Sequence, residues 1–283
     1  MDNIRQALER ARGPMAKAAV RLDLGPPAQP TRAPLGPTVA VPPPLEVREI
    51  VLAQAHLEAN RIIAHDETDP RARSFDMLRT QVLQAMDQKS WRVIGITSPT
   101  PGCGKTVTAT NLAFSIARQS ERSSLLVDLD LQKPQVAASL GVNCSEGIVA
   151  VLEGRCSLSS AVIQARAGAS HILALPAESS ASDSSAWMTS RTLSTTLQDI
   201  KRDYRSQTII LDLPPMLAGD DVIAVLPQLD CLLFVAAVGK SKVSEIEECN
   251  KHLRSTEVVR LVLNKVPAIE TNYYGYYRGK NRR

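Results

Sequence analysis

The sequence predicts an α/β protein with a doubly wound, mostly parallel sheet. From Trp91 onward, short apolar runs alternate with segments of helical character, the pattern of parallel strands covered by helices on both faces. Two of these runs, LLVDLDL and TIILDL, are almost continuously apolar, as expected for strands that are buried on both sides. A third run passes through a Pro/Gly-rich loop directly into a helical segment. Because parallel sheets bind ligands at the carboxyl ends of their strands, this loop and the neighbouring strand ends are where a site is expected.

Each expected strand is a short β-branched or apolar run, and the helices lie between these runs. Strands are expected near Arg92–Thr97, Ser124–Leu129, His171–Leu175, Thr208–Leu213, Cys231–Ala237 and Val259–Leu263. Helices are expected at Lys105–Gln119, Gly147–Glu153, Met188–Tyr204, Asp221–Leu226 and Ser244–Arg254. Residues 91–270 form the main predicted domain.

The chain before this domain has a different composition. Residues 1–44 are expected to hold a short helix and then a linker over Gly25–Pro44, which has eight prolines and no acidic residue. Residues 45–90 are expected to be a helical extension. Within it, Leu45–Ile63 is helical in part, and Arg71–Met86 is a helix whose apolar stripe packs on the main domain.

The stretch 92–113, RVIGITSPTPGCGKTVTATNLA, predicts a strand, a phosphate-binding loop and a helix. Gly102 and Gly104 lack the Cβ atoms that would keep backbone N–H groups from converging on a phosphate, and the helix adds the positive end of its dipole. Lys105 is expected to neutralise phosphate oxygens, and Thr106 offers a hydroxyl to Mg²⁺. The strict motif has Gly where this chain has Pro99.

Three acidic residues follow the ends of two apolar runs. Asp128 and Asp130 are spaced i, i+2, so on a strand they point the same way, and Asp212 ends a second buried run. We expect all three to converge with the phosphate loop on one cluster of Mg²⁺ and phosphate.

The net charge, the cysteines and the hydropathy of the chain argue against several classes of protein. The net charge is +4, and residues 271–283 alone hold four cations and no acid, so the rest of the chain sums to zero and no nucleic-acid partner is expected. The five cysteines form no C-x-x-C pair, which suits a reducing cytoplasm and argues against disulfides and zinc. No apolar stretch is long enough to span a membrane and no signal peptide is evident, so a cytoplasmic protein is expected.

The C-terminal tail, residues 271–283, concentrates tyrosine. Four of the five tyrosines of the chain lie there, Tyr273, Tyr274, Tyr276 and Tyr277, among glycines, asparagines and cations. A segment of this composition offers no packed partner for the rings, so we expect a flexible arm with exposed tyrosines.

Taken together, SPTPGCGKT, LLVDLDLQKP and IILDLPP resemble the Walker A, A′ and B motifs of the bacterial tyrosine kinases (BY-kinases) of exopolysaccharide synthesis. The resemblance extends from about Arg71 to the tail and includes Leu263-Asn-Lys265. It implies a P-loop NTPase fold related to the partitioning and cell-division ATPases. It also implies ATP-dependent autophosphorylation in trans on the tail tyrosines.

The resemblance also suggests roles for individual residues. Those expected to bind ATP are Pro101, Gly102, Cys103, Gly104, Lys105, Thr106, Val107 and Asn264. Thr106, Asp128 and Asp212 are expected to hold Mg²⁺, with Asp130 assisting. Asp128 is the first choice to orient or deprotonate the incoming phenol, although the choice between Asp128 and Asp130 stays open. The tail tyrosines are the expected acceptors, and their docking on a second copy would make a homo-oligomer.

The sequence departs from the family pattern at two places. Gln132 stands where the A′ motif has Arg, and Arg73-x-x-Asp76-x-x-Arg79 replaces the Glu-x-x-Arg-x-x-Arg of family assembly, so its first two charges are exchanged. The chain also lacks the membrane adaptor that is fused to many relatives. The expected partner is therefore the cytoplasmic segment of a separate membrane polysaccharide co-polymerase, which would recruit the chain to the inner face of the membrane.

Two other functions stay open at this point. A partitioning-type ATPase switch would carry an extra Lys in the loop, where this chain has Thr100 and Pro101. A nucleotide-binding scaffold with a degraded site would account for Pro99 and Gln132.

Overall fold

The computed structural model describes residues 47–181, 183–253 and 256–267. The expected N-terminal helix, the Pro-rich linker and the tyrosine tail lie outside these residues. Among the described residues no helix is both long enough and apolar enough to cross a bilayer.

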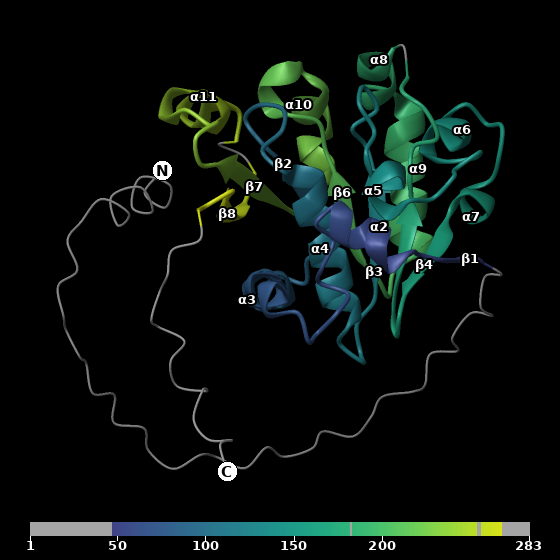
Figure 1. Ribbon diagram of the computed structural model, residues 1–283. Helices are drawn as coiled ribbons and strands as arrows, with labels where there is room; N and C mark the ends of the chain where they lie inside the picture. Colours follow the sequence, from purple (N-terminus) through teal and green to yellow (C-terminus); the bar gives the residue numbers. More distant parts are fainter. Residues whose placement is uncertain (1–46, 182, 254–255, 268–283) are drawn as a thin grey trace, which may run out of the picture. The chain divides into compact units, whose positions relative to one another are not determined.

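The core of the structure is one eight-stranded sheet in the order β1-β4-β5-β3-β6-β2-β7-β8 (Figure 1). The strands are β1 (Arg48–Val51), β2 (Val93–Thr97), β3 (Ser124–Asp128), β4 (Ile163–Ala167), β5 (Ser170–Leu175), β6 (Thr208–Asp212), β7 (Cys231–Ala237) and β8 (Val258–Asn264). All neighbours are parallel except β4 and β5, which are antiparallel. The predicted doubly wound, mostly parallel sheet is confirmed.

Helices cover both faces of this sheet (Figure 1). They are α2 (Gln54–Ala59), α3 (Arg73–Gln88), α4 (Lys105–Ala117), α5 (Val136–Leu140), α6 (Ile148–Leu152), α7 (Leu158–Ala161), α8 (Ser184–Met188), α9 (Arg191–Asp203), α10 (Asp221–Val225) and α11 (Val243–His252). Short 3₁₀ turns lie at η1 (Pro70–Ala72), η2 (Met216–Ala218) and η3 (Leu226–Gln228). Helices α2 to α5 contribute to one apolar cluster and α6 to α11 to the other.

Successive side chains of the central strands point to opposite faces of the sheet and so belong to different apolar clusters. In β3, Leu125 and Val127 belong to one cluster and Leu126 to the other, and all three are fully buried. The same alternation holds in β6, where every residue is buried. Strands with two buried faces explain why the sequence shows continuous apolar runs here.

Two strands were not expected from the sequence. β4 pairs antiparallel with β5, and β1 adds to the free side of β4, so the segment Leu45–Ile63, expected to be helical in part, contains a strand before its helix α2. In β4 buried and partly exposed residues alternate, giving IQARA, and β1 has only four residues, REIV. Both strands are too short and too polar to show as apolar runs.

The helix expected at Met188–Tyr204 is α9, which begins three residues later at Arg191, and the short helix α8 that ends at Met188 was not expected. Ser190 separates them because its side chain accepts a hydrogen bond from the backbone N–H of Leu193 and so caps α9.

The segment before β2 is held against α4 by Asn111. Its Oδ1 accepts hydrogen bonds from the backbone N–H groups of Ile63 and Ala64, and its Nδ2 donates to the carbonyls of Arg61 and Val107. As expected, α3 also packs its apolar stripe on this side, with Val82, Leu83 and Met86 buried in the same cluster as α4.

Candidate functional site

The loop between β2 and α4, residues 98–104, has the backbone of a phosphate cradle. Gly102 and Gly104 both have positive φ, +76° and +93°, which side chains with a Cβ rarely adopt. A Cβ on Gly104 would collide with the Asn264 amide, whose Nδ2 donates to the Cys103 carbonyl at 2.9 Å. Asn264 at the end of β8 therefore braces the loop from outside the motif.

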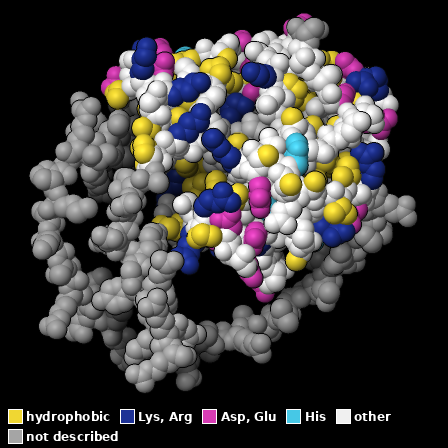
Figure 2. All heavy atoms as spheres, viewed as in Figure 1, with side chains coloured by type: hydrophobic (Ala, Val, Ile, Leu, Met, Phe, Trp, Pro, Cys, Tyr) yellow, Lys and Arg dark blue, Asp and Glu magenta, His cyan; other side chains and the backbone are white. Residues whose placement is uncertain are grey.

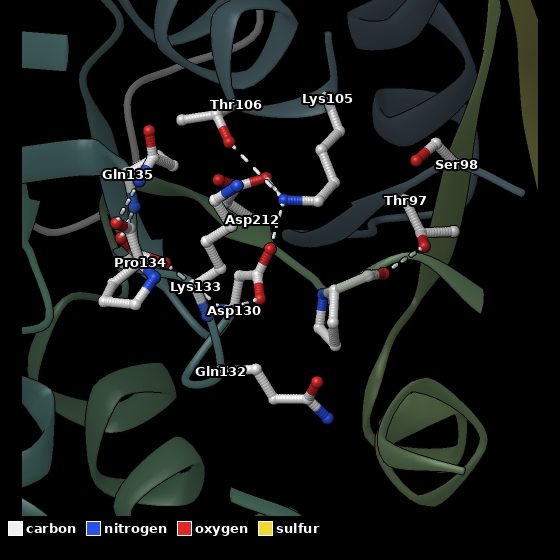
Figure 3. A network of polar contacts seen from close by, with 12 residues as sticks. Thr97, Ser98, Lys105, Thr106, Asp130, Gln132, Lys133, Pro134, Gln135 and Asp212 are labelled. Atoms are coloured by element: carbon white, nitrogen blue, oxygen red, sulfur yellow. Dashed lines mark hydrogen bonds and ion pairs between the residues drawn. The ribbon is translucent and has the colours of Figure 1, made fainter. Parts of the chain in front are cut away.

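The carboxylates lie at the ends of adjacent strands. Asp128 and Asp212 are register partners in the β3–β6 pair, and both are fully buried. Figure 3 shows Lys105 pointing from the start of α4 toward Asp130 and Asp212. Its Nζ lies 2.6 Å from Asp130 Oδ2, 3.8 Å from Asp212 Oδ1 and 3.5 Å from Thr106 Oγ1. The structure thus brings together all five of the motif residues that were expected to meet.

Asp128 also has a structural role. Its Oδ2 accepts hydrogen bonds from the backbone N–H groups of Gln135 and Val136, at 3.0 and 2.9 Å, where α5 begins. Its Oδ1 accepts a third from Asp130 N at 3.2 Å. The carboxylate therefore fixes the whole turn that carries Asp130.

Burial and nearby charges shift the pKa values of Asp128, Asp212 and Lys105. Burial, with the nearby charge of Asp212, raises the pKa of Asp128 to about 8. Burial also raises the pKa of Asp212, against the lowering effect of the Lys105 charge. For Lys105, burial lowers the pKa, but Asp212 and Asp130 outweigh it, so the pKa is raised and the ammonium stays charged. A buried cluster with this surplus of negative charge favours a cation.

Asp212 is the residue that best fits a metal ion. Both of its carboxylate oxygens are buried and have no hydrogen-bond partner among the described residues, a state that is costly for a group able to ionise. Among the described residues, no three His, Cys, Asp or Glu side chains are placed to hold a metal by themselves. Mg²⁺ commonly takes one or two carboxylates and completes its shell with water and phosphate oxygens, so Asp212 and Thr106 fit that ion.

Gln132 connects the loop after β3 to a second group of polar residues and points away from Lys105 (Figure 3). Its Nε2 donates to Asp221 Oδ2 at 3.0 Å, and the buried Asp221 carboxylate also accepts from the hydroxyls of Ser184 and Ser185. The uncharged residue at the motif's Arg position is therefore used for a contact within the chain.

Sequence reasoning missed one part of the site, the turn between β7 and α11. There Ser241 Oγ lies 3.4 Å from Cys103 Sγ, and the Lys240 side chain lies against Gly102. No motif covers this turn, so only the fold brings it to the loop. A cavity of about 890 Å³ lies elsewhere, along the end of α4 and the β4–β5 turn, and none of the motif residues lines it.

This chain is similar to a family of nucleotide-binding domains and to several tyrosine-protein kinases. The AAA domain family matches residues 91–236. The putative tyrosine-protein kinase EpsB of Ralstonia nicotianae is 28% identical over 221 residues, which cover 75% of this chain and 27% of EpsB. The tyrosine-protein kinase YwqD of Bacillus subtilis is 25% identical over 229 residues, which cover 80% of this chain and 94% of YwqD. The chain thus spans about a quarter of the length of EpsB but nearly all of YwqD.

Solved structures agree. The kinase domain of the Escherichia coli tyrosine kinase ETK matches with a TM-score of 0.63 at 25% identity, covering 72% of this chain and 80% of that one. The VpsO kinase domain matches with a TM-score of 0.61 at 28% identity, covering 69% and 96%. With its phosphate loop, its two acidic strand ends and these relatives, the chain belongs to the AAA domain family and, within it, to the bacterial tyrosine kinases.

Proposed function

We propose that the protein is an ATP-dependent tyrosine autokinase that phosphorylates its own C-terminal cluster, Tyr273, Tyr274, Tyr276 and Tyr277, in trans, and that it regulates exopolysaccharide synthesis or export. One observation carries the proposal: the phosphate loop and the buried carboxylate of Asp212 meet through Lys105, in a chain whose residues 271–283 hold four tyrosines. The resemblance to kinase domains of 25–28% identity supports it.

In this proposal MgATP supplies the phosphoryl group and the divalent charge that accompanies it. Lys105 and the backbone of residues 101–107 bind the phosphates, and Asn264 keeps the loop in shape. Thr106 and Asp212 hold the metal directly or through water, with Asp128 and Asp130 beside them.

Asp128 is our choice for the group that orients the phenol and takes its proton. A carboxylate with a pKa of about 8 is better matched to a phenol than an ordinary one, since a tyrosine hydroxyl titrates near 10. Its three backbone hydrogen bonds leave about one of its four lone-pair positions for a substrate. Asp130 is the alternative base, because its side chain is slightly exposed. Its ion pair with Lys105 makes it the second choice.

The deciding experiment is incubation of the purified full chain with labelled ATP and Mg²⁺. Phosphotyrosine on the tail supports the kinase. Free phosphate without phosphotyrosine would instead indicate the partitioning-type switch, and nucleotide binding without turnover would indicate the scaffold. Mixing a catalytically inactive full-length chain with an active chain whose tail tyrosines are all Phe tests transfer in trans.

A first prediction concerns Lys105→Met. Loss of the ammonium should lower phosphotyrosine formation by about 100-fold or more, because charge stabilisation supplies most of phosphoryl-transfer catalysis. The measurement is the initial rate of labelling, with folding checked by circular dichroism. The control is Lys251→Met, which removes an exposed lysine of α11 that pairs only with Glu248. A folded Lys105→Met chain that labels at the wild-type rate would contradict the site.

A second prediction concerns an activating partner. Exposed apolar side chains lie near the phosphate loop: Leu217 in η2, Ile223 in α10, Val238 after β7 and Val243 in α11. η2 is joined directly to the loop, since Met216 N and Leu217 N donate to the carbonyls of Ser98 and Pro99. We propose that this surface binds the cytoplasmic segment of a membrane polysaccharide co-polymerase, which brings the chain to the membrane.

The isolated protein should then be weakly active, and addition of the adaptor segment should raise its rate about tenfold or more. Val238→Asp should abolish this stimulation, whereas Val51→Asp, at the far edge strand β1 and 62% exposed, should leave it intact. Full activity without any adaptor segment would contradict the proposal.

A further inference from the structure

The turn that joins β7 to α11 is rigidly built. Gly239 has a φ of +72°, and Lys240 N and Ser241 N both donate to the carbonyl of Ala237, at 3.2 and 2.9 Å. Ser241 Oγ in turn accepts from Ala237 N at 3.0 Å. With these backbone groups used inside the turn, the exposed side chains of Lys240 and Lys242 are the charged groups that the turn presents outward, and Lys240 is the one that contacts the phosphate loop.

This turn contacts the phosphate loop at two points. Ser241 Oγ lies 3.4 Å from the buried Cys103 Sγ. A Cβ built on Gly102 would lie 2.6 Å from the Nζ and 3.3 Å from the Cε of Lys240, so the ammonium rests on the open face of that glycine. Figure 2 shows Lys and Arg side chains on the part of the surface that carries α11 and the β2–α4 loop.

The Lys240 ammonium is not used in the fold. The residue is exposed, and among the described residues no carboxylate oxygen lies within 4.0 Å of its Nζ. Lys105 differs, because it is buried and paired with Asp130. A lysine that contacts the loop but has no counter-charge is available to an anion.

The phosphate loop has few backbone N–H donors in its first half, and a nearby cation would compensate for them. Pro99 and Pro101 lack backbone N–H groups, so the first half of the loop offers fewer donors to a phosphate than a glycine-rich loop does. Of the three nearby acids, Asp128, Asp130 and Asp212, two form ion pairs with Lys105, the one lysine that pairs with them among the described residues, and none of the three attracts a phosphate. A second cation would reduce the repulsion of a nucleotide's terminal phosphate.

We propose that Lys240 is a second phosphate-binding cation of the site, which contacts the terminal phosphate of a bound nucleoside triphosphate and favours it over the diphosphate. This inference rests on the proposed nucleotide site, which it extends to a residue outside every motif. Thr100 and Pro101 give the loop no second lysine, and Lys240 supplies that second positive charge from the β7–α11 turn.

The test is titration calorimetry of the full chain with MgATP and with MgADP. Lys240→Gln should weaken MgATP binding about tenfold, as a lost charged hydrogen bond does, and should weaken MgADP binding clearly less. Lys240→Arg should keep most of the affinity for MgATP. Lys251→Gln removes the same charge from the exposed side of α11 and should change neither titration.

A second measurement follows the amine itself. Acetylation of Lys240 by a small reagent, read by mass spectrometry, should slow several-fold in the presence of MgATP, whereas acetylation of Lys251 should not. Equal MgATP affinities of the wild type and Lys240→Gln, or unprotected Lys240, would overturn the proposal and leave the kinase assignment intact. A wild-type chain that binds neither nucleotide would overturn both.

Discussion

Asp128 and Asp212 are register partners on the adjacent buried strands β3 and β6, and in the described part of the chain only Asp128 has hydrogen-bond partners. A pair of this kind costs stability when both carboxylates are ionised, because burial and mutual repulsion oppose the charged forms. Their raised pKa values mean that the folded chain retains protons that the unfolded chain releases. The arrangement suits a ligand that brings positive charge, and it is unfavourable without one.

The pH dependence follows from the sign of these shifts. A carboxyl whose pKa rises on folding contributes stability below its ordinary value of 3.8, and this contribution is lost as the pH rises toward about 8. Without nucleotide and metal, the wild type should therefore lose stability between about pH 4 and pH 8. Asp212→Asn removes one acid and lowers the pKa of the other.

We therefore predict that Asp212→Asn is more stable than the wild type at pH 8, by on the order of 1 kcal/mol or more, and nearly equal to it at pH 5. Thermal unfolding in EDTA measures this. MgATP should raise the melting temperature of the wild type but not of the variant. Asp130→Asn is the control, since it breaks the ion pair with Lys105 and should destabilise. A variant that melts below the wild type at pH 8 would contradict the argument.

The sequence predicted that Asp128, Asp130 and Asp212 lie close together, but it did not predict which groups each carboxylate contacts. Spacing i, i+2 at a strand end put Asp128 and Asp130 near Asp212, and the structure confirms this. The path of residues 130–136 determines that Asp128 also binds backbone N–H groups, and no local pattern encodes that path. Lys240 was missed for the same reason, because only the order of β7 and β2 in the sheet brings it to the loop.

At the scale of elements, the seam between α3 and α4 is held by one carboxylate. Asp76 accepts hydrogen bonds from Ser115 Oγ at 2.7 Å, from Arg118 Nη2 at 2.8 and 2.9 Å, and from Arg79 Nη1 at 3.1 Å. Two of the three positions that the family resemblance associates with assembly, Asp76 and Arg79, are thus used within the chain. This favours tail docking over α3 as the route to self-association.

We predict that Asp76→Ala destabilises the fold by about 1–3 kcal/mol, because it leaves two partly buried guanidinium groups without their carboxylate. The pKa of Asp76 is lowered, since its bonds to Ser115 and Arg118 outweigh burial, so in the wild type this contribution fades as the pH falls below the ordinary carboxyl range. Urea unfolding at pH 7 and below about pH 3 measures both effects.

Asp87→Ala is the matched control on the same helix. Asp87 pairs with Arg122, but both side chains are well exposed, so its loss should matter little. Equal destabilisation by the two variants would show that the Asp76 network has no special role.

Strands were predictable where the sequence shows an apolar run, in fully buried strands as well as in the partly exposed β5 and β8, and not where polar residues interrupt the run. β2, β3 and β6 are buried on both faces and read as apolar runs, and each was expected within one or two residues of its bounds. β4 and β1 depend on pairing with β5 and with each other, so their short mixed sequences acquire strand structure only in the sheet. The α8–α9 break depends on a single serine cap inside a continuous apolar pattern.

For the whole molecule, the proposed function requires the nucleotide-binding core to act on the tail of a second copy. The tail, residues 271–283, carries +4 and lies outside the described residues. The proposed transfer in trans requires this arm to reach the site of a second copy. There the acids Asp128, Asp130 and Asp212, and the phosphates of a bound nucleotide, provide negative charge.

The last prediction is that phosphorylation of the tail ends this association. Each phosphate adds about −1.5 to −2 near pH 7, so two modified tyrosines bring the arm close to neutral and four make it clearly negative. Dephosphorylated protein should therefore self-associate more strongly than phosphorylated protein, and its association should fall more steeply with salt, since the attraction is electrostatic. Analytical ultracentrifugation before and after incubation with MgATP measures this.

In the matched variant, with Tyr273, Tyr274, Tyr276 and Tyr277 all changed to Phe, the charge of the tail cannot change and association should be the same before and after ATP. Equal association of the two wild-type forms would rule out the charge mechanism, and the phosphotyrosine assay would still decide the kinase function separately.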